Sequence, residues 1–164
     1  MSDDPMTIEA QIHRLRTGDL AARIEAAAAL TTAGSAAVPA LIAVLQDPSA
    51  DNDTRWRAAV ILGDIGDRAG VPPLITAIHD PSWEIQHSAV WALGRIQTPE
   101  SFAALRAVVE HLHTEEQVPY VAALALIAVD RGRAEPVLIS ARQHADDAVR
   151  RIAYAALATL KYTD

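Results

Sequence analysis

A repeat of about thirty-two residues runs through the chain. Five segments each end in a leucine that follows an alanine by four residues. The alanines are Ala26, Ala58, Ala89, Ala122 and Ala153, and the leucines are Leu30, Leu62, Leu93, Leu126 and Leu157. An alanine at the same place in every repeat indicates that two helices pack closely there, because a larger side chain would push them apart. One such unit cannot bury its apolar face alone, so neighbouring units must stack into a continuous core.

A second helical pattern alternates with the first and has the same period. Its leucines are Leu41, Leu74, Leu105 and Leu138. Proline stands early in these segments, as at Pro39 and Pro72, where the first helical turn tolerates its missing N–H. The pairs Asp47-Pro48 and Asp80-Pro81 indicate turns followed by helix N-caps, and glycines such as Gly94 are expected to end helices in the left-handed conformation.

We therefore predict an all-α fold, a right-handed α-solenoid of about five helical hairpins, with no strands. Residues 1–5 are expected to form a flexible N-terminus and 6–164 a single domain. The repeats lie near 6–34, 35–67, 68–97, 98–132 and 133–162. The first helices of the pairs are predicted near 6–17, 36–46, 69–79, 99–112 and 134–145, and the second helices near 20–33, 53–66, 82–96, 115–130 and 147–162.

The segments 57–63, Arg-Ala-Ala-Val-Ile-Leu-Gly, and 88–94, Ser-Ala-Val-Trp-Ala-Leu-Gly, resemble the HEAT repeat, and in particular the phycobilisome-lyase (PBS lyase) HEAT-like repeat. The resemblance covers about residues 6–162. It implies that the second helix of each pair lines the inner curve of the solenoid. It also implies a ladder of Asp–Arg contacts between repeats, which Gln86 and Pro119 would interrupt because they replace the arginine of the other repeats.

Composition excludes several classes of function. The absence of cysteine removes disulfides, cysteine-ligated metals and thiol catalysis, and a net charge of -7 argues against nucleic-acid binding. The longest apolar stretch, 36–45, is too short to span a bilayer, and the acidic start, 1–5, lacks the features of a secretory signal. We expect a cytoplasmic protein that binds neither nucleic acid nor a membrane. One lysine against thirteen arginines suits a GC-rich bacterial gene.

Catalytic and metal-binding motifs are largely missing. The sequence has no His-Glu-x-x-His, no Gly-rich phosphate loop and no Gly-x-Ser-x-Gly elbow. The segment 110–116 is rich in His and Glu, but it lies at an expected helix end, so we predict no metal and no other cofactor. Deoxyhypusine hydroxylases are a class of enzymes built on HEAT repeats, and membership of that class would imply iron bound through His-Glu dipeptides. This chain has no His-Glu dipeptide. We therefore expect the protein not to be an enzyme.

The inner face implied by the resemblance carries several aromatic residues. In the third repeat Ile85, Ala89 and Leu93 form the expected buried stripe, and the opposite stripe is His87, Trp91 and Arg95. Equivalent and adjacent positions complete the candidate site with Trp56, Arg57, Val60, Tyr120, Leu124 and Arg151. A helical phase shifted by one position would instead place the aromatic rings in the core.

These residues predict a non-catalytic protein–protein interaction scaffold. Its groove would grip a helix or peptide of another protein by burying aromatic area, with Arg57, Arg95 and Arg151 favouring an acidic partner. Two alternatives stay open. One is the handling of a small molecule or tetrapyrrole, as an enzyme or accessory subunit similar to the bilin lyases. The other is a structural scaffold without a ligand groove. We expect a monomer or a weak homodimer.

Overall fold

A computed structural model of the protein describes residues 7–111 and 117–160; the expected flexible N-terminus lies outside them. Within this part the chain forms ten α-helices, two short 3₁₀-helices and no strand. The helices are α1 (Ile8–Thr17), α2 (Leu20–Ala33), η1 (Gly34–Ala37), α3 (Val38–Gln46), α4 (Asn52–Ile65), η2 (Arg68–Gly70), α5 (Val71–Ala77), α6 (Trp83–Ile96), α7 (Pro99–His111), α8 (Gln117–Val129), α9 (Arg131–Ala141) and α10 (Asp147–Leu160). The all-α prediction is confirmed.

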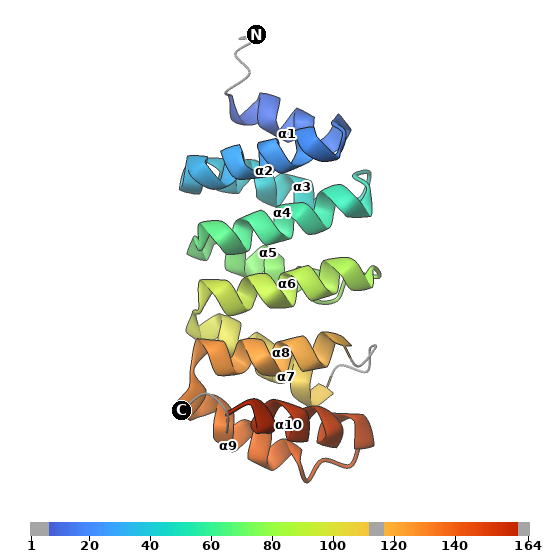
Figure 1. Ribbon diagram of the computed structural model, residues 1–164, viewed down its shortest axis with the longest axis vertical. Helices are drawn as coiled ribbons and strands as arrows, with labels where there is room; N and C mark the ends of the chain where they lie inside the picture. Colours follow the sequence, from blue (N-terminus) through green and yellow to red (C-terminus); the bar gives the residue numbers. More distant parts are fainter. Residues whose placement is uncertain (1–6, 112–116, 161–164) are drawn as a thin grey trace.

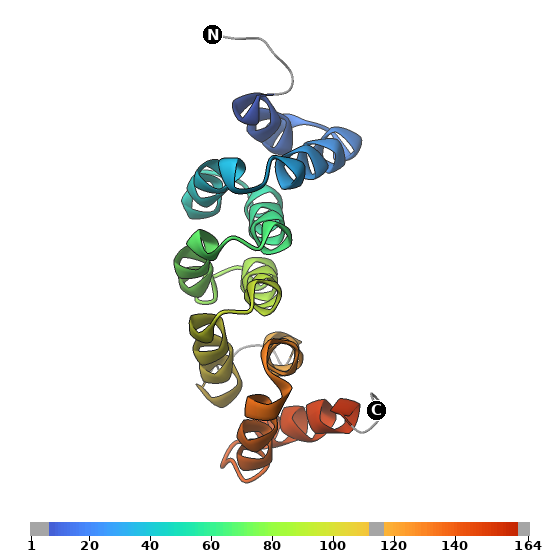
Figure 2. The same ribbon diagram turned by 90° about the vertical axis from the view of Figure 1, so that its left-hand side faces the viewer.

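Five helical pairs stack along one axis (Figure 1). The even-numbered helices form one layer and the odd-numbered helices from α3 onward form the other, so the stack appears as two columns when seen from the side (Figure 2). The even-numbered layer faces the concave side, and α2 and α10 project at its two ends. The predicted α-solenoid, with the second helix of each pair on the inner curve, is therefore observed.

Helix α9 departs most from its predicted bounds of 134–145. The carboxylate of Asp130 accepts a hydrogen bond from the backbone N–H of Arg133 at 3.0 Å and starts the helix at Arg131. The predicted start at 134 would have placed Pro136 in the first turn, whereas this proline lies inside the observed helix.

The predicted buried positions form the core. The five repeated alanines are all fully buried, as are Leu41, Leu74, Leu105 and Leu138 of the second pattern. Of the closing leucines, Leu30, Leu62, Leu93 and Leu126 are buried. Leu157, on the last described helix, is partly buried and packs against the core. The repeat therefore sets the core.

Two buried glycines let the even-numbered helices approach closely. A Cβ added to Gly63 in α4 would lie 2.7 Å from the Cα of Ala92 in α6, and one added to Gly94 in α6 would lie 2.7 Å from the Cβ of Ala125 in α8. The prediction that Gly94 ends its helix is wrong. Helix α6 continues to Ile96 and is capped by Gln97 at φ 57°, and Gly94 is needed instead for helix packing.

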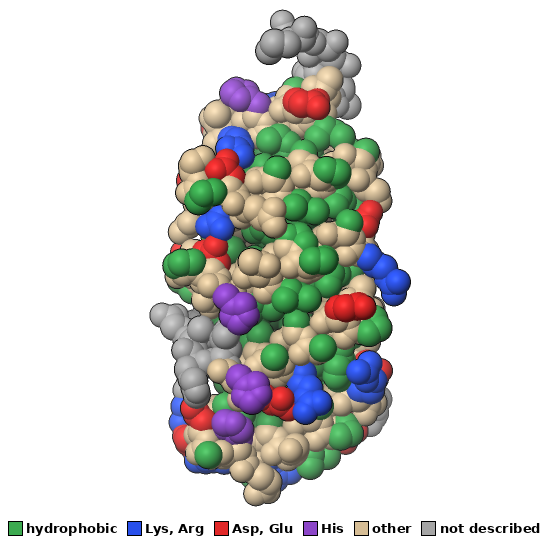
Figure 3. All heavy atoms as spheres, turned by 180° about the vertical axis from the view of Figure 1, so that it is seen from behind, with side chains coloured by type: hydrophobic (Ala, Val, Ile, Leu, Met, Phe, Trp, Pro, Cys, Tyr) green, Lys and Arg blue, Asp and Glu red, His purple; other side chains and the backbone are tan. Residues whose placement is uncertain are grey.

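Ion pairs connect the first repeats along the edge that carries the Asp-Pro turns, where basic and acidic side chains alternate at the left of Figure 3. Arg55 donates to Asp80 of the next repeat at 2.6 Å and to the carbonyl of Leu45 at 3.0 Å. At the next equivalent position Gln86 donates only to the carbonyl of Asp80, at 2.7 Å. Among the described residues the ladder stops there, as the sequence predicts.

The segment Leu20–Gln46 is apolar and long enough to cross a membrane by length and composition alone. In the fold it is not one straight helix. Gly34, at φ 61°, ends α2 and begins η1, which leads into α3, so that α2 and α3 belong to different layers of the stack (Figure 2). Its apolar character is that of two helices that contribute to the solenoid core.

The glycine contacts predict that Gly63→Ala destabilises the fold by about 1–3 kcal/mol, although alanine favours helix more than glycine does. The added methyl would meet the backbone of α6, which must move. Gly132→Ala in α9 is the matched control, because its new Cβ would meet only the Asp130 carboxylate at 3.6 Å. We expect that control to be neutral or stabilised in urea unfolding; equal losses in both variants would contradict the packing role.

The ladder predicts that Arg55→Met costs about 2 kcal/mol, because it leaves the nearly buried Asp80 carboxylate without its cation. Arg106→Met is the control: Arg106 also pairs with a carboxylate, Glu110 at 2.9 Å, but on the exposed surface of α7. The control should change the free energy of unfolding by less than about 0.5 kcal/mol. Thermal and urea unfolding would measure both, and similar losses would argue against a special role for the ladder.

Candidate binding groove on the concave face

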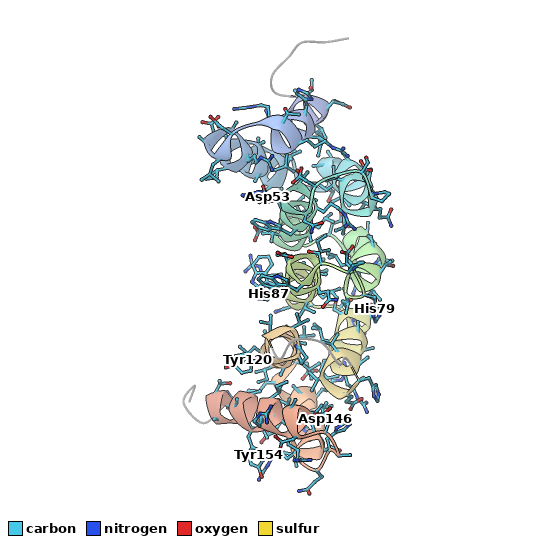
Figure 4. All side chains as sticks on the ribbon, turned by 90° about the vertical axis from the view of Figure 1, so that its right-hand side faces the viewer. Asp53, His79, His87, Tyr120, Asp146 and Tyr154 are labelled. Carbon is cyan, nitrogen blue, oxygen red and sulfur yellow. The ribbon has the colours of Figure 1, made fainter. Side chains whose placement is uncertain are left out.

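A groove of about 600 Å³ lies between α4 and α6 on the concave face. Trp56 and Val60 of α4 and Trp83, Glu84, His87, Ser88 and Trp91 of α6 line it. In Figure 4, His87 and Tyr120 lie on this side of the stack, whereas His79 lies on the opposite side. The groove therefore opens on the surface that the sequence analysis selected for binding.

Helical spacing places the groove residues together. Trp83, His87 and Trp91 are four residues apart on α6 and so form one stripe, while Ile85 and Ala89, toward the other side of the helix, are fully buried. Trp56 and Val60 have the same spacing on α4. The expected buried stripe of Ile85, Ala89 and Leu93 is therefore observed.

The three indole rings differ in their surroundings. Trp56 and Trp91 are partly buried and pack against the core, and Trp91 lies beside Gly63, whose missing side chain leaves room for the ring. Trp83 is 47% exposed and meets the His87 ring in an edge contact, with 6.3 Å between centroids. Trp56 and Trp91 therefore pack against the core on one side of each ring. The alternative in which the rings fill the core applies to them only in part.

Asp53 fixes Trp56 and Arg57 at the edge of the groove. The indole N–H of Trp56 donates to Asp53 at 3.1 Å, and Arg57 donates to the same carboxylate at 3.0 Å. The Arg57 guanidinium also stacks 4.5 Å from the centroid of the Trp56 ring. The hydrogen bond from Arg57 lowers the pKa of Asp53 despite partial burial, so the carboxylate is charged at neutral pH.

The other two arginines of the predicted site are also paired within the chain. Arg95 lies 5.4 Å from the Trp91 ring centroid and 3.3 Å from the Asp64 carboxylate. Arg151 pairs with Asp147 one turn earlier on α10. Together with Arg57, all three arginines that were expected to attract an acidic partner already contact a carboxylate.

Glu84 is the acidic group that lines the groove itself. The hydroxyl of Ser82 donates to its carboxylate at 2.5 Å, and this hydrogen bond lowers the pKa of Glu84. Within residues 7–111 and 117–160, no cation forms an ion pair with it. The groove thus combines apolar aromatic walls with one charged carboxylate.

The structure gathers only part of the predicted site. Trp56, Val60, His87 and Trp91 line the groove, and Arg57 and Arg95 cover two of its rings. Tyr120 and Leu124 lie on α8, beyond the groove, and Arg151 lies on the last helix. Glu84 was not among the predicted binding residues, although its position three residues before His87 on the same helix was the available signal.

Three of the known proteins that this chain resembles are named as enzymes or belong to an enzyme complex. A protein named deoxyhypusine hydroxylase from Eremothecium gossypii is 33% identical over 125 residues, which are 76% of this chain and 39% of the relative. A chain in the complex of CpcE and CpcF of phycocyanin lyase from Nostoc sp. PCC7120 is 28% identical, with a TM-score of 0.62, over 95% of this chain and 65% of that one. Human deoxyhypusine hydroxylase in complex with glycerol has the same fold, at 20% identity and a TM-score of 0.63 over 97% of this chain and 64% of that one.

The expectation that the protein is not an enzyme is contradicted by the similarity to a curated relative that is named as an enzyme, deoxyhypusine hydroxylase. The chain spans about two fifths of the curated relative's length and under two thirds of either solved chain. The chain lacks the His-Glu dipeptides that are implied to bind iron in deoxyhypusine hydroxylases. Within residues 7–111 and 117–160, no group of three or more His, Cys, Asp or Glu side chains is placed to hold a metal ion; residues 112–116 of the predicted cluster 110–116 lie outside the described residues.

Family models match most of the first four repeats. The model for HEAT repeats matches residues 38–116, and the model for the PBS lyase HEAT-like repeat matches residues 22–47. The matched segments include α4 and α6, which form the groove. The chain therefore carries HEAT repeats, and one of them is of the PBS lyase HEAT-like type.

Proposed function

We propose that the protein binds a segment of a partner protein in the groove between α4 and α6, and that it does so as a subunit of an enzyme. The observation that carries this proposal is the groove itself, with three tryptophans and His87 around an open space of about 600 Å³. The similarity to a chain of the phycocyanin lyase complex, at 28% identity over 95% of this chain, supports an assembly with a second protein.

The groove suits protein binding for physical reasons. Tryptophan buries a large apolar area and loses little conformational entropy, which is why it dominates many interfaces. Trp56 is held by Asp53 and Arg57, so its ring is already oriented before a partner arrives. Trp83, which is the most exposed of the three rings, offers the area that binding would bury.

Handling of a tetrapyrrole is a second candidate, favoured by the size of the groove and its flat aromatic walls. The resemblance to bilin lyases implies this class of ligand. His87 supplies a titratable group beside the rings, which is the kind of group that acid–base chemistry on a bound ligand would use. A fluorescence titration with biliverdin, followed through the three tryptophans, would separate this candidate from peptide binding.

Selection from a displayed random-peptide library against the purified chain would test the protein-binding proposal. We expect the selected peptides to lose about 30-fold in affinity for Trp83→Ala, which corresponds to about 2 kcal/mol. Helicity and melting temperature should stay close to those of the wild type, because Trp83 is half exposed.

Tyr154→Ala is the matched control, because Tyr154 is an equally exposed aromatic residue on α10, outside the groove. The selected peptides should bind this variant as they bind the wild type. Equal affinity for the Trp83 variant and the wild type would show that the peptides bind elsewhere and would contradict the proposal.

A further inference from the structure

The charges around the groove balance with one exception. Three arginines near the groove are matched by three aspartates, so this set contributes no net charge. The ion pairs are Arg23 with Asp51 and Asp53, Arg57 with Asp53, and Arg95 with Asp64. The remaining charge is the Glu84 carboxylate, which has no cationic partner among the described residues and lines the groove directly. The groove therefore carries a net negative charge.

Two of the three rings already hold a cation. Arg57 lies over the Trp56 ring at 4.5 Å, and Arg95 lies over the Trp91 ring at 5.4 Å. The face of an indole ring attracts cations because of its quadrupole. In the described part of the chain no arginine or lysine lies over Trp83, which is the most exposed ring and the immediate neighbour of Glu84. One indole ring and one carboxylate of the groove, adjacent in sequence, therefore have no cation beside them among the described residues.

We infer that the partner segment is basic, and that it places a lysine or arginine side chain against Trp83 with its charge at Glu84. This inference rests on the proposed function and names the chemistry of the partner. It reverses the acidic partner expected from the sequence, because the arginines that would have selected it are paired within the chain. The net charge of -7 favours approach of a basic segment as well.

Two synthetic helical peptides would test the inference. They share one apolar face and differ only in their polar face, which carries three lysines in one peptide and three glutamates in the other. We expect the wild-type chain to bind the lysine peptide at least tenfold more tightly in calorimetry. Glu84→Gln should weaken binding of the lysine peptide by about fivefold to tenfold, because it removes the charge and keeps the shape of the side chain.

Glu9→Gln is the matched control. Glu9 is an exposed carboxylate on α1, outside the groove, and its loss changes the net charge of the protein by the same amount. Affinity for the lysine peptide should change less than twofold in this variant. Equal weakening by both glutamate substitutions would show that the preference comes from overall charge and would overturn the inference.

The remaining outcomes separate the two proposals. If both peptides bind equally well and both lose affinity in Trp83→Ala, the groove binds proteins but not through a cation, so the inference fails and the proposed function stands. Preference for the glutamate peptide would also overturn the inference alone. If neither peptide binds below about 1 mM, both proposals fail.

Discussion

The close contact between neighbouring even-numbered helices is the constraint on which the structure depends. Gly63 meets Ala92, and Gly94 meets Ala125, at distances that leave no room for one more carbon atom. The closest contacts between these helices are therefore made by small residues, and the large aromatic side chains Trp56, Trp83 and Trp91 of α4 and α6 line the groove on the concave surface instead. Trp91 shows the connection directly, since its ring lies in the space that Gly63 leaves free. Core packing and the presence of a groove thus have the same cause.

Intramolecular pairing decides which groups of the groove remain available to a ligand. The single carboxylate of Asp53 accepts hydrogen bonds from three side chains, those of Trp56, Arg57 and Arg23. Such contacts orient the rings. They also pair, within the chain, the arginines on which recognition of an acidic partner would depend. What remains is an exposed indole and a carboxylate, a combination whose electrostatics favour cations. The ligand preference of the groove is therefore set by the groups that have no ion-pair partner among the described residues, and less by the charges that are already paired.

Periodicity predicted the fold and the buried faces of the helices well, because both depend on which residues share a side of a helix. The alanine and leucine positions gave the core, and the spacing of His87 and Trp91 gave the concave stripe. The pairing of Arg57 and Arg95 could not be predicted, since it depends on side-chain conformations and on contacts between repeats. Gly94 was misassigned for a related reason: glycine ends helices and also permits close packing, and the spacing does not distinguish these roles.

The last ion pair of the ladder joins the two walls of the groove. Arg55 belongs to α4, and Asp80 lies in the turn that leads into α6, so their contact at 2.6 Å ties one wall to the start of the other. With Gly63 setting the distance from the inside, the width of the opening is fixed before any ligand arrives. Binding of a ligand would then carry only a small free-energy cost for ordering the two walls of the groove. Such preorganisation favours rapid docking of a short segment and selects ligands by the thickness of the side chain they insert.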